Sequence, residues 1–567
     1  MTASSTVASE QLQKVCDRYW DLQLERHPVW ASELGYHRFD HLLPDYGSAS
    51  RELYYQQIHA VEADFKGVEL DALQGNDRVT HEVMAHLLRT DLDGEVFREE
   101  CWSVNPLHGP WTMLTELADR QPVVPHAALE RLKARFRAAP RLLEQITENL
   151  RDGIQQGQVV SQIGPERVAA QLRRLLKIDP DKSSFMPGPE RVAALTDEAT
   201  ARVKQELVEV VQGEVYPALD RFASFLEQEY LPHTRTEPGL CHMPSGREYY
   251  QFLIELFTSR PDSAERIHQV GLEELKRVHE EMRHISLEMA GIADLREFAA
   301  WLRARPDQYL HDRDAVVAFN RAAIARAEAA LPRAFNRLPT RRCVVRPIEQ
   351  FREMDSPSGY YSHASEDGTR PAYYYVNTSR PESRPAYNME ALAFHEAVPG
   401  HHLQIALAQE LDGLHPVRRH IGQTAYVEGW ALYSERLCNE LGLYSSPTMR
   451  FGMLNYQAWR AARLVVDTGL HALGWSREKA MEVLMANTAH GTAEASIEVD
   501  RYICMPGQAL SYMTGRMAID ALRRECEQRL GSQFDLKIFH ARTLEHGALP
   551  LASLERVVQH WLAEEGV

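Results

Sequence analysis

Long apolar runs are absent from this sequence, because no stretch approaches the roughly 20 apolar residues that cross a bilayer. The first residues carry neither a basic start nor an apolar segment, so we expect no secretory signal. The seven cysteines are an odd number without a C-x-x-C pair, which argues against a disulfide framework and against a cysteine metal site. Together these absences predict a soluble protein in the reducing cytoplasm.

Basic residues are also scarce relative to acidic ones. The 63 lysines and arginines face 80 aspartates and glutamates, which gives a formal net charge of -17. Nucleic acids and anionic membranes reward clustered positive charge, so we expect neither as a partner. With 567 residues the chain is long enough for a large buried core. We predict a single unit over 1–567, in which 1–205 and 206–567 are candidate lobes.

Helical spacing dominates the chain. Segments such as 127–137 place apolar residues at helical intervals with charges between them. Strand signals occur in two places, the β-branched run 343–349 and the tyrosine-rich run 371–378, with the turn-rich segment 356–368 between them. The pattern predicts a mainly α fold that contains one small β-sheet.

The sheet comes just before a histidine-rich apolar segment, 391–404. Three histidines and one glutamate lie within eight residues there. A zinc hydrolase motif, His-Glu-x-x-His, places two imidazoles one helical turn apart, with the glutamate aimed at the bound water. Here His395 and Glu396 begin such a motif, but Pro399 stands where the second histidine belongs. The segment therefore predicts a metal site with an altered second ligand.

Helix geometry restricts which histidine completes this site. On a straight helix, His395 and His401 lie on different faces, and His402 returns to the first face roughly 10 Å further on. Pro399 cannot continue the helix ladder and Gly400 permits unusual dihedrals, so the two can form a loop that folds the next histidine back. On reach we prefer His401 as the second ligand. The alternative is His402, and the histidine not used would orient the site or bind substrate.

A third ligand must come from elsewhere in the chain, because catalytic zinc usually has three protein ligands and one open position. The best candidate is Glu428, on a helical segment that also carries Glu435 seven residues later on the same face. Glu435 is the alternative ligand, or the acceptor that fixes a histidine tautomer. Both glutamates could instead pair with arginines such as Arg436 or Arg460. Zinc is the expected ion, with cobalt and manganese as alternatives for the same ligand types.

With these residues in view, the sequence resembles the bacterial family catalogued as domain of unknown function 885, placed in the gluzincin-like clan of zinc metallopeptidases. The resemblance extends over most of the chain. The segments that carry it are 395–404, 428–435, 463–471, 506–512 and 239–250.

The resemblance implies an architecture and a set of roles. The fold would have two helical halves around a deep cleft, similar to helical zinc carboxypeptidases and oligopeptidases, with the metal helix at its floor. Glu396 would be the general base. The strand 372–377 would be an edge strand that pairs with an extended peptide, which makes Tyr374 and Asn377 substrate-binding residues.

Two further roles follow from the same resemblance. Tyr512, or else Tyr502, would donate a hydrogen bond to the oxyanion, and both are therefore candidate site residues. Arg501 would bind a carboxylate of the substrate.

The reaction predicted from this set is hydrolysis of an amide bond in a short peptide or peptide-like small molecule. A second hypothesis is a metal-dependent lyase or amidohydrolase that acts on a metabolite, for which extra polar groups are available at His402, His471 and His490. A third is a pseudoenzyme that binds peptides without cleaving them, which the altered motif motivates.

Overall fold

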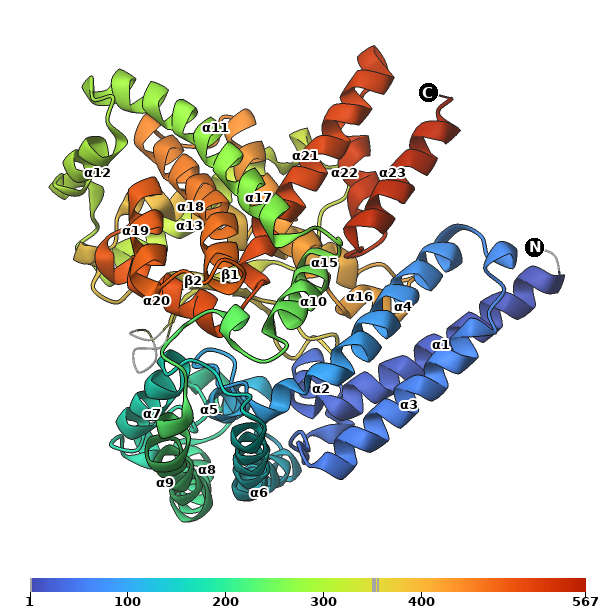
Figure 1. Cartoon of the computed structure of the whole chain (residues 1–567), viewed down its shortest axis with the longest axis vertical. Coiled ribbons are helices and arrows are strands. Elements are labelled where there is room, and N and C mark those ends of the chain that lie inside the picture. The colour runs from blue at the N-terminus through green and yellow to red at the C-terminus, as the bar shows by residue number, and fades with distance from the viewer. Residues whose placement is uncertain (1–2, 349–352, 354–355, 567) are drawn as a thin grey trace.

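The computed structural model describes residues 3–348, 353 and 356–566, and it is mainly helical (Figure 1). Among the described residues, no helix combines the length and apolarity that crossing a membrane requires. The helices of the first part of the chain are α1 (Ala3–Arg26), α2 (Pro28–Leu34), α3 (Ser48–Lys66), α4 (Gly75–Gly94), α5 (Pro110–Arg120), α6 (His126–Gln156), α7 (Ile163–Leu175), α8 (Asp197–Val210) and α9 (Tyr216–Phe225).

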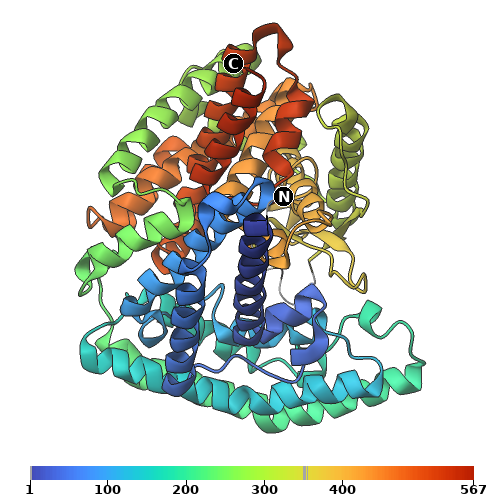
Figure 2. The same cartoon turned by 90° about the vertical axis from the view of Figure 1, so that its right-hand side faces the viewer.

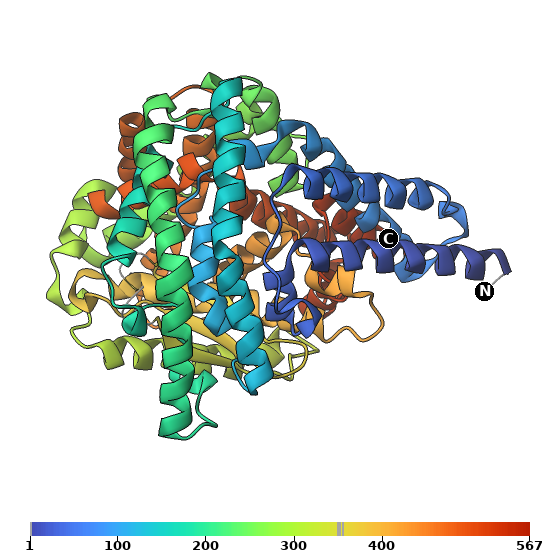
Figure 3. The ribbon, with the colours of Figure 1, turned by 90° about the horizontal axis from the view of Figure 1, so that it is seen from below.

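Helices α8 and α9 join through the π-helical turn Val211–Val215 into one long helical segment, which lies alongside α6 (Figures 2 and 3). The buried residues of α5 to α9 form one hydrophobic cluster, whereas those of α1 and α4 pack with the part of the chain from α10 onward. The candidate boundary between residues 205 and 206 falls inside α8. The continuous helix leaves no linker at that position, and the division into two lobes stays a prediction.

The second part of the chain surrounds a central helix, α18, which is buried along most of its length and packs against α11. Its start is defined by Pro447 and by Ser446, whose side chain accepts a hydrogen bond from the Met449 amide. The helices here are α10 (Gly246–Thr258), α11 (Ala264–Ala290), α12 (Leu295–Arg303), α13 (Arg313–Ala330), α14 (Met389–Glu396), α15 (His401–Gln409), α16 (Pro416–His420), α17 (Thr424–Glu440), α18 (Pro447–His471), α19 (Arg477–Asn487), α20 (Thr492–Cys504), α21 (Ser511–Leu530), α22 (Leu536–Leu544) and α23 (Leu551–Glu564).

A three-stranded sheet precedes α14, as the sequence predicts. Its strands are β1 (Cys343–Pro347), β2 (Gly359–Ser362) and β3 (Ala372–Val376), in the order β1-β3-β2. β3 runs parallel to β1 and antiparallel to β2. Residue 349, the end of the predicted run 343–349, lies outside the described residues. β2 forms within the segment expected to be turns, because β3 supplies its ladder partners.

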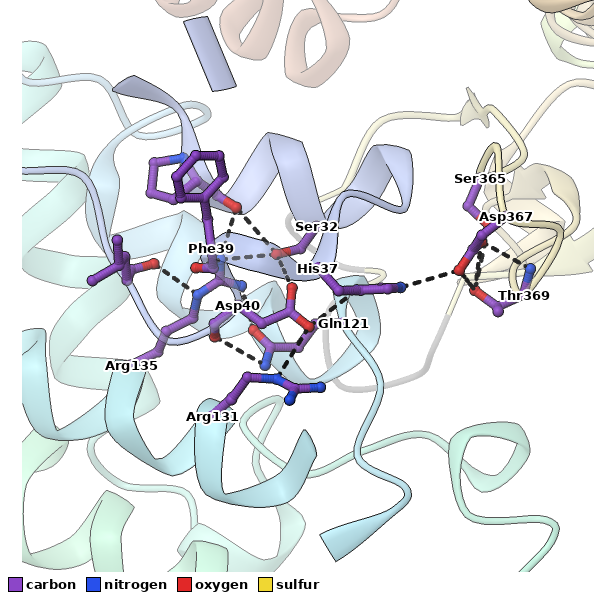
Figure 4. A network of polar contacts seen from close by, with 12 residues as sticks. Ser32, His37, Phe39, Asp40, Gln121, Arg131, Arg135, Ser365, Asp367 and Thr369 are labelled. Carbon is purple, nitrogen blue, oxygen red and sulfur yellow. Dashed lines mark hydrogen bonds and ion pairs between the residues drawn. The ribbon is translucent and has the colours of Figure 1, made fainter. Parts of the chain in front are cut away.

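A polar network anchors the N-terminal helices to the rest of the molecule (Figure 4). The guanidinium of Arg135, on α6, is fully buried and donates to the carbonyls of Leu42 (2.8 Å) and Pro28 (2.7 Å). Burial lowers the pKa of Arg135 to about 10. His37 lies between Asp40 and Asp367, at 3.0 Å from each. Since Asp367 belongs to the loop between β2 and β3, this network fixes the start of the chain against the sheet.

Candidate metal centre

The histidine-rich segment forms two helices separated by the linker Ala397–Gly400. The Val398–Pro399 peptide bond in this linker is cis. Gly400 passes so close to α14 that a Cβ there would lie 1.9 Å from the carbonyl oxygen of His395. Only glycine permits this approach. The imidazole rings of His395 and His401 consequently stand edge to face, with their centroids 4.7 Å apart.

A carboxylate from α17 completes a set of three potential ligands. Glu428 Oε2 lies 3.6 Å from His395 Nε2 and 3.4 Å from His401 Nε2. Zn–N and Zn–O bonds of about 2.0–2.1 Å in a tetrahedron place ligand atoms about 3.4 Å apart. Glu428 Oε2 is buried and has no hydrogen-bond partner among the described residues. The two separations from Glu428 Oε2 are therefore close to those between ligands of one tetrahedral ion.

The electrostatics of the cluster favour a positive charge between the carboxylates. Burial lowers the pKa of His395, but Glu428 and Glu435 outweigh burial and raise that pKa to about 10. Burial raises the pKa of Glu428, but the imidazoles of His395 and His401 hold it well below its usual value. A divalent cation would supply the positive charge that this arrangement stabilises.

Glu435 lies on the opposite side of His395 from Glu428. Its Oε1 atom is 2.9 Å from His395 Nδ1, and its other oxygen accepts a weaker hydrogen bond from Gln457 at 3.3 Å. The side chain is fully buried. An Nδ1 proton donated to Glu435 leaves Nε2 free to face Glu428, so Glu435 has the position of the orienting acceptor rather than that of a ligand.

His402 is not brought to the cluster. Its Nδ1 atom is 3.2 Å from the Tyr361 hydroxyl and its Nε2 atom is 3.0 Å from the Arg341 carbonyl oxygen. Both ring nitrogens therefore have partners away from Glu428. Burial lowers the pKa of His402 to about 4, which keeps the ring neutral. The alternative that places His402 at the metal does not fit this structure.

Glu396, the last residue of α14, stays beside the two imidazoles. One carboxylate oxygen of Glu396 and one nitrogen from each of His395 and His401 lie within 4.8 Å of one another. Burial raises the pKa of Glu396, and the two histidines partly offset that effect. The backbone of Tyr361, in β2, forms a hydrogen bond with the carboxylate. Glu396 can thus exchange a proton with a molecule held at the cluster.

Another His/Glu group among the described residues has a different character. His126, Glu130 and Glu206 place ligand atoms within the same distance of one another, but none of them is buried. Lys133 already pairs with both carboxylates, at 2.7 Å and 2.8 Å. Since the lysine supplies the positive charge, we assign no metal to this group.

Of the two predicted hydrogen-bond donors to the oxyanion, Tyr512 and Tyr502, Tyr512 lies near the cluster. Its ring stacks on the ring of His395 with centroids 6.3 Å apart, and its hydroxyl accepts a hydrogen bond from Arg501 Nη2 at 3.1 Å. Arg501 also donates to Gln508 at 2.9 Å, so this arginine holds Tyr512 in place. The Tyr502 hydroxyl, in contrast, accepts from both Trp459 and Arg463 in a fully buried position. These contacts hold the Tyr502 hydroxyl beside Arg463 on α18, and its substrate-binding role stays a prediction.

The edge-strand prediction for 372–377 is wrong, because β3 is the central strand of the sheet. Tyr374 is fully buried and donates to Asn320 Oδ1 at 3.0 Å. Asn377 Nδ2 donates to the carbonyl oxygens of Glu353, Ser356 and Pro357 at 2.6–3.1 Å. Both predicted substrate-binding residues therefore have structural roles. β2 is the edge strand beside Glu396.

Residues of α18 that our sequence analysis did not assign to the site lie next to Tyr512. The guanidinium carbon of Arg463 is 4.4 Å from the centre of the Tyr512 ring, and that of Arg460 is 5.9 Å away. Arg460 was considered only as a partner for the glutamates, and its Nη2 atom lies 3.8 Å from Glu435 Oε1. Arg460 and Arg463 are three residues apart, which places them on one face of a helix. That spacing is the signal in the sequence from which the pair could be predicted.

The chain was compared with known families, curated proteins and solved structures. A family model described as "Bacterial protein of unknown function (DUF885)" matches residues 28–558. No curated protein matches the chain. A solved structure described as a "putative lipoprotein" from Colwellia psychrerythraea is 27% identical, with a TM-score of 0.92 over 100% of both chains. Another, a "putative lipoprotein of unknown function" from Shewanella oneidensis, is 20% identical, with a TM-score of 0.73 over 97% of this chain and 99% of that chain.

Proposed function

We propose that this chain, which belongs to the DUF885 family of bacterial proteins, is a zinc-dependent hydrolase that cleaves amide bonds in short peptides or peptide-like small molecules. The observation that supports this most strongly is the position of Glu428 Oε2, 3.4 Å from one imidazole nitrogen and 3.6 Å from another. These separations match those between ligands of a tetrahedral zinc ion, about 3.4 Å.

His395, His401 and Glu428 would hold the ion, and three protein ligands leave the open position that a catalytic zinc requires. When bound, zinc supplies a Lewis acid that lowers the pKa of a water molecule toward about 7 and polarises a carbonyl group. The carboxylate of Glu396 takes a proton from the attacking water and passes it to the leaving amine. Glu435 keeps His395 in the tautomer that this arrangement needs.

Tyr512 has the position to stabilise the oxyanion, because its ring stacks beside His395 and Arg501 restrains its hydroxyl. A fixed phenol of this kind lowers the barrier without reorganisation during the reaction. The peptide itself would pair with β2, since β2 forms the sheet edge whose backbone contacts Glu396. We therefore propose β2, rather than β3, as the strand that pairs with the peptide. We also propose that the architecture is similar to that of gluzincin-clan carboxypeptidases and oligopeptidases.

We also propose a cytoplasmic location, on the basis of the cysteines. All seven are free in the structure, which suits a reducing compartment. The two solved relatives are described as lipoproteins, which favours the cell envelope as the second candidate location. Cell fractionation distinguishes them, since recovery of the native protein with the envelope would contradict the cytoplasmic proposal.

The experiment that tests the function uses zinc-loaded protein and a panel of blocked and unblocked dipeptides and tripeptides. The Glu396→Gln variant should keep its zinc and lose about 10²- to 10⁴-fold in kcat, because it loses the proton acceptor but not the ligands. Glu410→Gln is the matched control: Glu410 follows α15, and its carboxylate accepts hydrogen bonds from Thr340. This variant should have the turnover of the wild type.

Three outcomes would contradict the proposal. Equal turnover by fully metallated wild-type and Glu396→Gln protein would remove the assigned base. Inactivity of metallated wild-type protein on every peptide would favour the lyase or amidohydrolase hypothesis, and the absence of stoichiometric metal would favour the pseudoenzyme.

A further inference from the structure

Two buried arginines lie on the face of α18 that points toward the metal centre. The side chains of Arg460 and Arg463 are 4% and 2% exposed. Their guanidinium carbons lie 4.5 Å and 4.3 Å from the centre of the Trp459 ring. Both also face the Tyr512 ring. The aromatic rings therefore hold two cations close together in a region with little solvent.

Several donors of these arginines have no acceptor. Arg463 donates through Nε to Tyr502 at 3.0 Å and through Nη2 to Glu498 at 3.1 Å, but its Nη1 atom has no partner among the described residues. Within the residues that the structure describes, Arg460 has no hydrogen-bond partner at Nε or at Nη1. Its Nη2 atom is 3.8 Å from Glu435, beyond hydrogen-bond distance.

His490 adds a third unpaired group to this region. Its ring stands edge to face against Trp459 with centroids 4.6 Å apart, and its Nδ1 atom is buried without a partner among the described residues. Arg460, Arg463 and His490 are thus three nitrogen-bearing side chains around one indole.

Buried guanidinium groups with unused donors are unfavourable, because desolvation is not repaid by hydrogen bonds. Binding sites are one place where natural proteins retain such groups, because a ligand can supply the missing acceptors. Guanidinium donors match a carboxylate best, since their planar fork can bind both of its oxygens. The arrangement is consequently suited to a carboxylate anion.

This region is coupled to the proposed catalytic residues through two contacts. The Tyr512 ring lies between the arginines and His395, on which it stacks. Arg460 approaches Glu435, which orients the same histidine. A carboxylate bound by the arginines would therefore be separated from His395 by the Tyr512 ring, so the two sites can contact different parts of one peptide.

We propose that Arg460 and Arg463 form a subsite that binds a carboxylate of the substrate and thereby selects anionic peptides. The inference rests on the proposed function. The carboxylate is either the C-terminus of the peptide or an acidic side chain, and both supply the same acceptor geometry. Arg501 donates through Nη2 to Gln508 and Tyr512, so we assign it the positioning of Tyr512, and its role in binding a carboxylate stays a prediction from the sequence.

The test is a binding measurement by isothermal titration with full-length, zinc-loaded Glu396→Gln protein, which separates binding from turnover. The probes are Ala-Ala-Ala, its C-terminal amide, and the amide of Ala-Glu-Ala. We expect Ala-Ala-Ala to bind about 10- to 100-fold more tightly than its amide, the range for hydrogen bonds to a charged group. If the acidic side chain is the recognised group, the Ala-Glu-Ala amide should instead be the probe that binds more tightly than the Ala-Ala-Ala amide.

Arg460→Gln and Arg463→Gln, introduced into the same protein, should abolish the preference for the carboxylate and leave binding of the Ala-Ala-Ala amide unchanged. Arg436→Gln is the matched control, because Arg436 donates both of its terminal nitrogens to Glu281. Equal affinity of the starting protein for all three probes would overturn the subsite and leave the proposed hydrolase intact. A preference without any turnover by wild-type enzyme would uphold the subsite as an anion site and refute the hydrolase.

The melting temperature of an Arg460 variant distinguishes the proposed substrate-binding role from a purely structural role. Arg460→Met keeps the length of the side chain and removes the buried Nε and Nη1 donors that lack acceptors, so we expect a melting temperature equal to or above that of the wild type, together with loss of the carboxylate preference. A lower melting temperature with the preference retained would contradict the proposal. If this variant does not fold, Arg460→Lys provides the test, since it keeps the charge but loses the fork and should reduce the preference.

Discussion

Replacing Glu435 by glutamine removes one negative charge from the metal centre while keeping its shape. The glutamine carbonyl can still accept the His395 Nδ1 proton, which Glu435 Oε1 accepts at 2.9 Å. Because Glu435 does not contact Glu428 or His401, the three proposed ligands remain in place. The variant therefore isolates the electrostatic contribution of the orienting carboxylate.

The expected magnitude follows from the burial of this contact. Loss of an outer-shell partner of a metal ligand typically reduces metal affinity by 10- to 100-fold, or about 1.4–2.7 kcal/mol. Glu435 is fully buried, which strengthens the effect, whereas Arg460 at 3.8 Å already offsets part of its charge. We therefore expect a zinc affinity 10- to 100-fold below that of the wild type, with the stoichiometry unchanged.

The assay is competition for zinc between the protein and a chromogenic chelator at fixed pH. Tyr361→Phe is the control, since it removes the hydroxyl that contacts His402 at 3.2 Å and leaves the contacts of His395 unchanged. This control should keep the zinc affinity of the wild type. A Glu435→Gln affinity within twofold of the wild type would refute the orienting role.

Three further predictions concern Gly400 at the metal centre and the buried residues Asn377 and Asp467 elsewhere in the fold. Gly400→Ala places a methyl group 1.9 Å from the His395 carbonyl oxygen, so we expect at least tenfold weaker zinc binding in the chelator assay and a lower melting temperature; normal binding would contradict the close approach. Asn377→Ala removes the hydrogen bonds from Asn377 Nδ2 to the buried carbonyl of Glu353 and to the part-buried carbonyls of Ser356 and Pro357, so urea unfolding should show a loss of about 1–3 kcal/mol with zinc affinity intact, whereas a loss of peptide binding alone would support its predicted substrate role. Burial raises the pKa of Asp467 to about 7, so the folded protein retains a proton that the unfolded chain loses near pH 4. The contribution of Asp467 to stability should therefore fall as pH rises from about 4 to 7, by up to about 1.4 kcal/mol per unit, so the slope of stability against pH should be more positive in Asp467→Asn than in the wild type; equal slopes in urea unfolding would contradict that pKa.

The predictable part of the fold came from local patterns. Helical periodicity indicated a mainly α protein, and the β-branched and tyrosine-rich runs indicated strands β1 and β3. α8 contains no proline or glycine around residue 205, so its continuity there was available from the sequence; Gly213, in the π-helical turn that follows, does not interrupt the helical segment.

The order of the strands could not be predicted, because it depends on pairing between distant segments. β2 has four residues within a turn-rich segment, and it becomes a strand only through its ladder with β3. β3 thereby becomes the central strand, and Tyr374 and Asn377 turn into structural residues.

At the site, steric reasoning about Pro399 and Gly400 was sufficient to place His401 beside His395, and helix periodicity was sufficient to place Glu428 and Glu435 on one face. The unpaired donors of Arg460 and Arg463 could not be predicted. Whether a buried arginine finds an acceptor depends on the side chains that the whole fold brings around it.

The most direct test of the metal centre is the zinc content of purified wild-type protein and of the variants His401→Gln, Glu428→Gln and His402→Gln, measured by mass spectrometry after dialysis against metal-free buffer. We predict one zinc ion per chain in the wild type and in His402→Gln, and far less in the other two. Full occupancy in His401→Gln or Glu428→Gln, or the absence of stoichiometric metal from the wild type, would contradict the assignment of His395, His401 and Glu428 as the ligands.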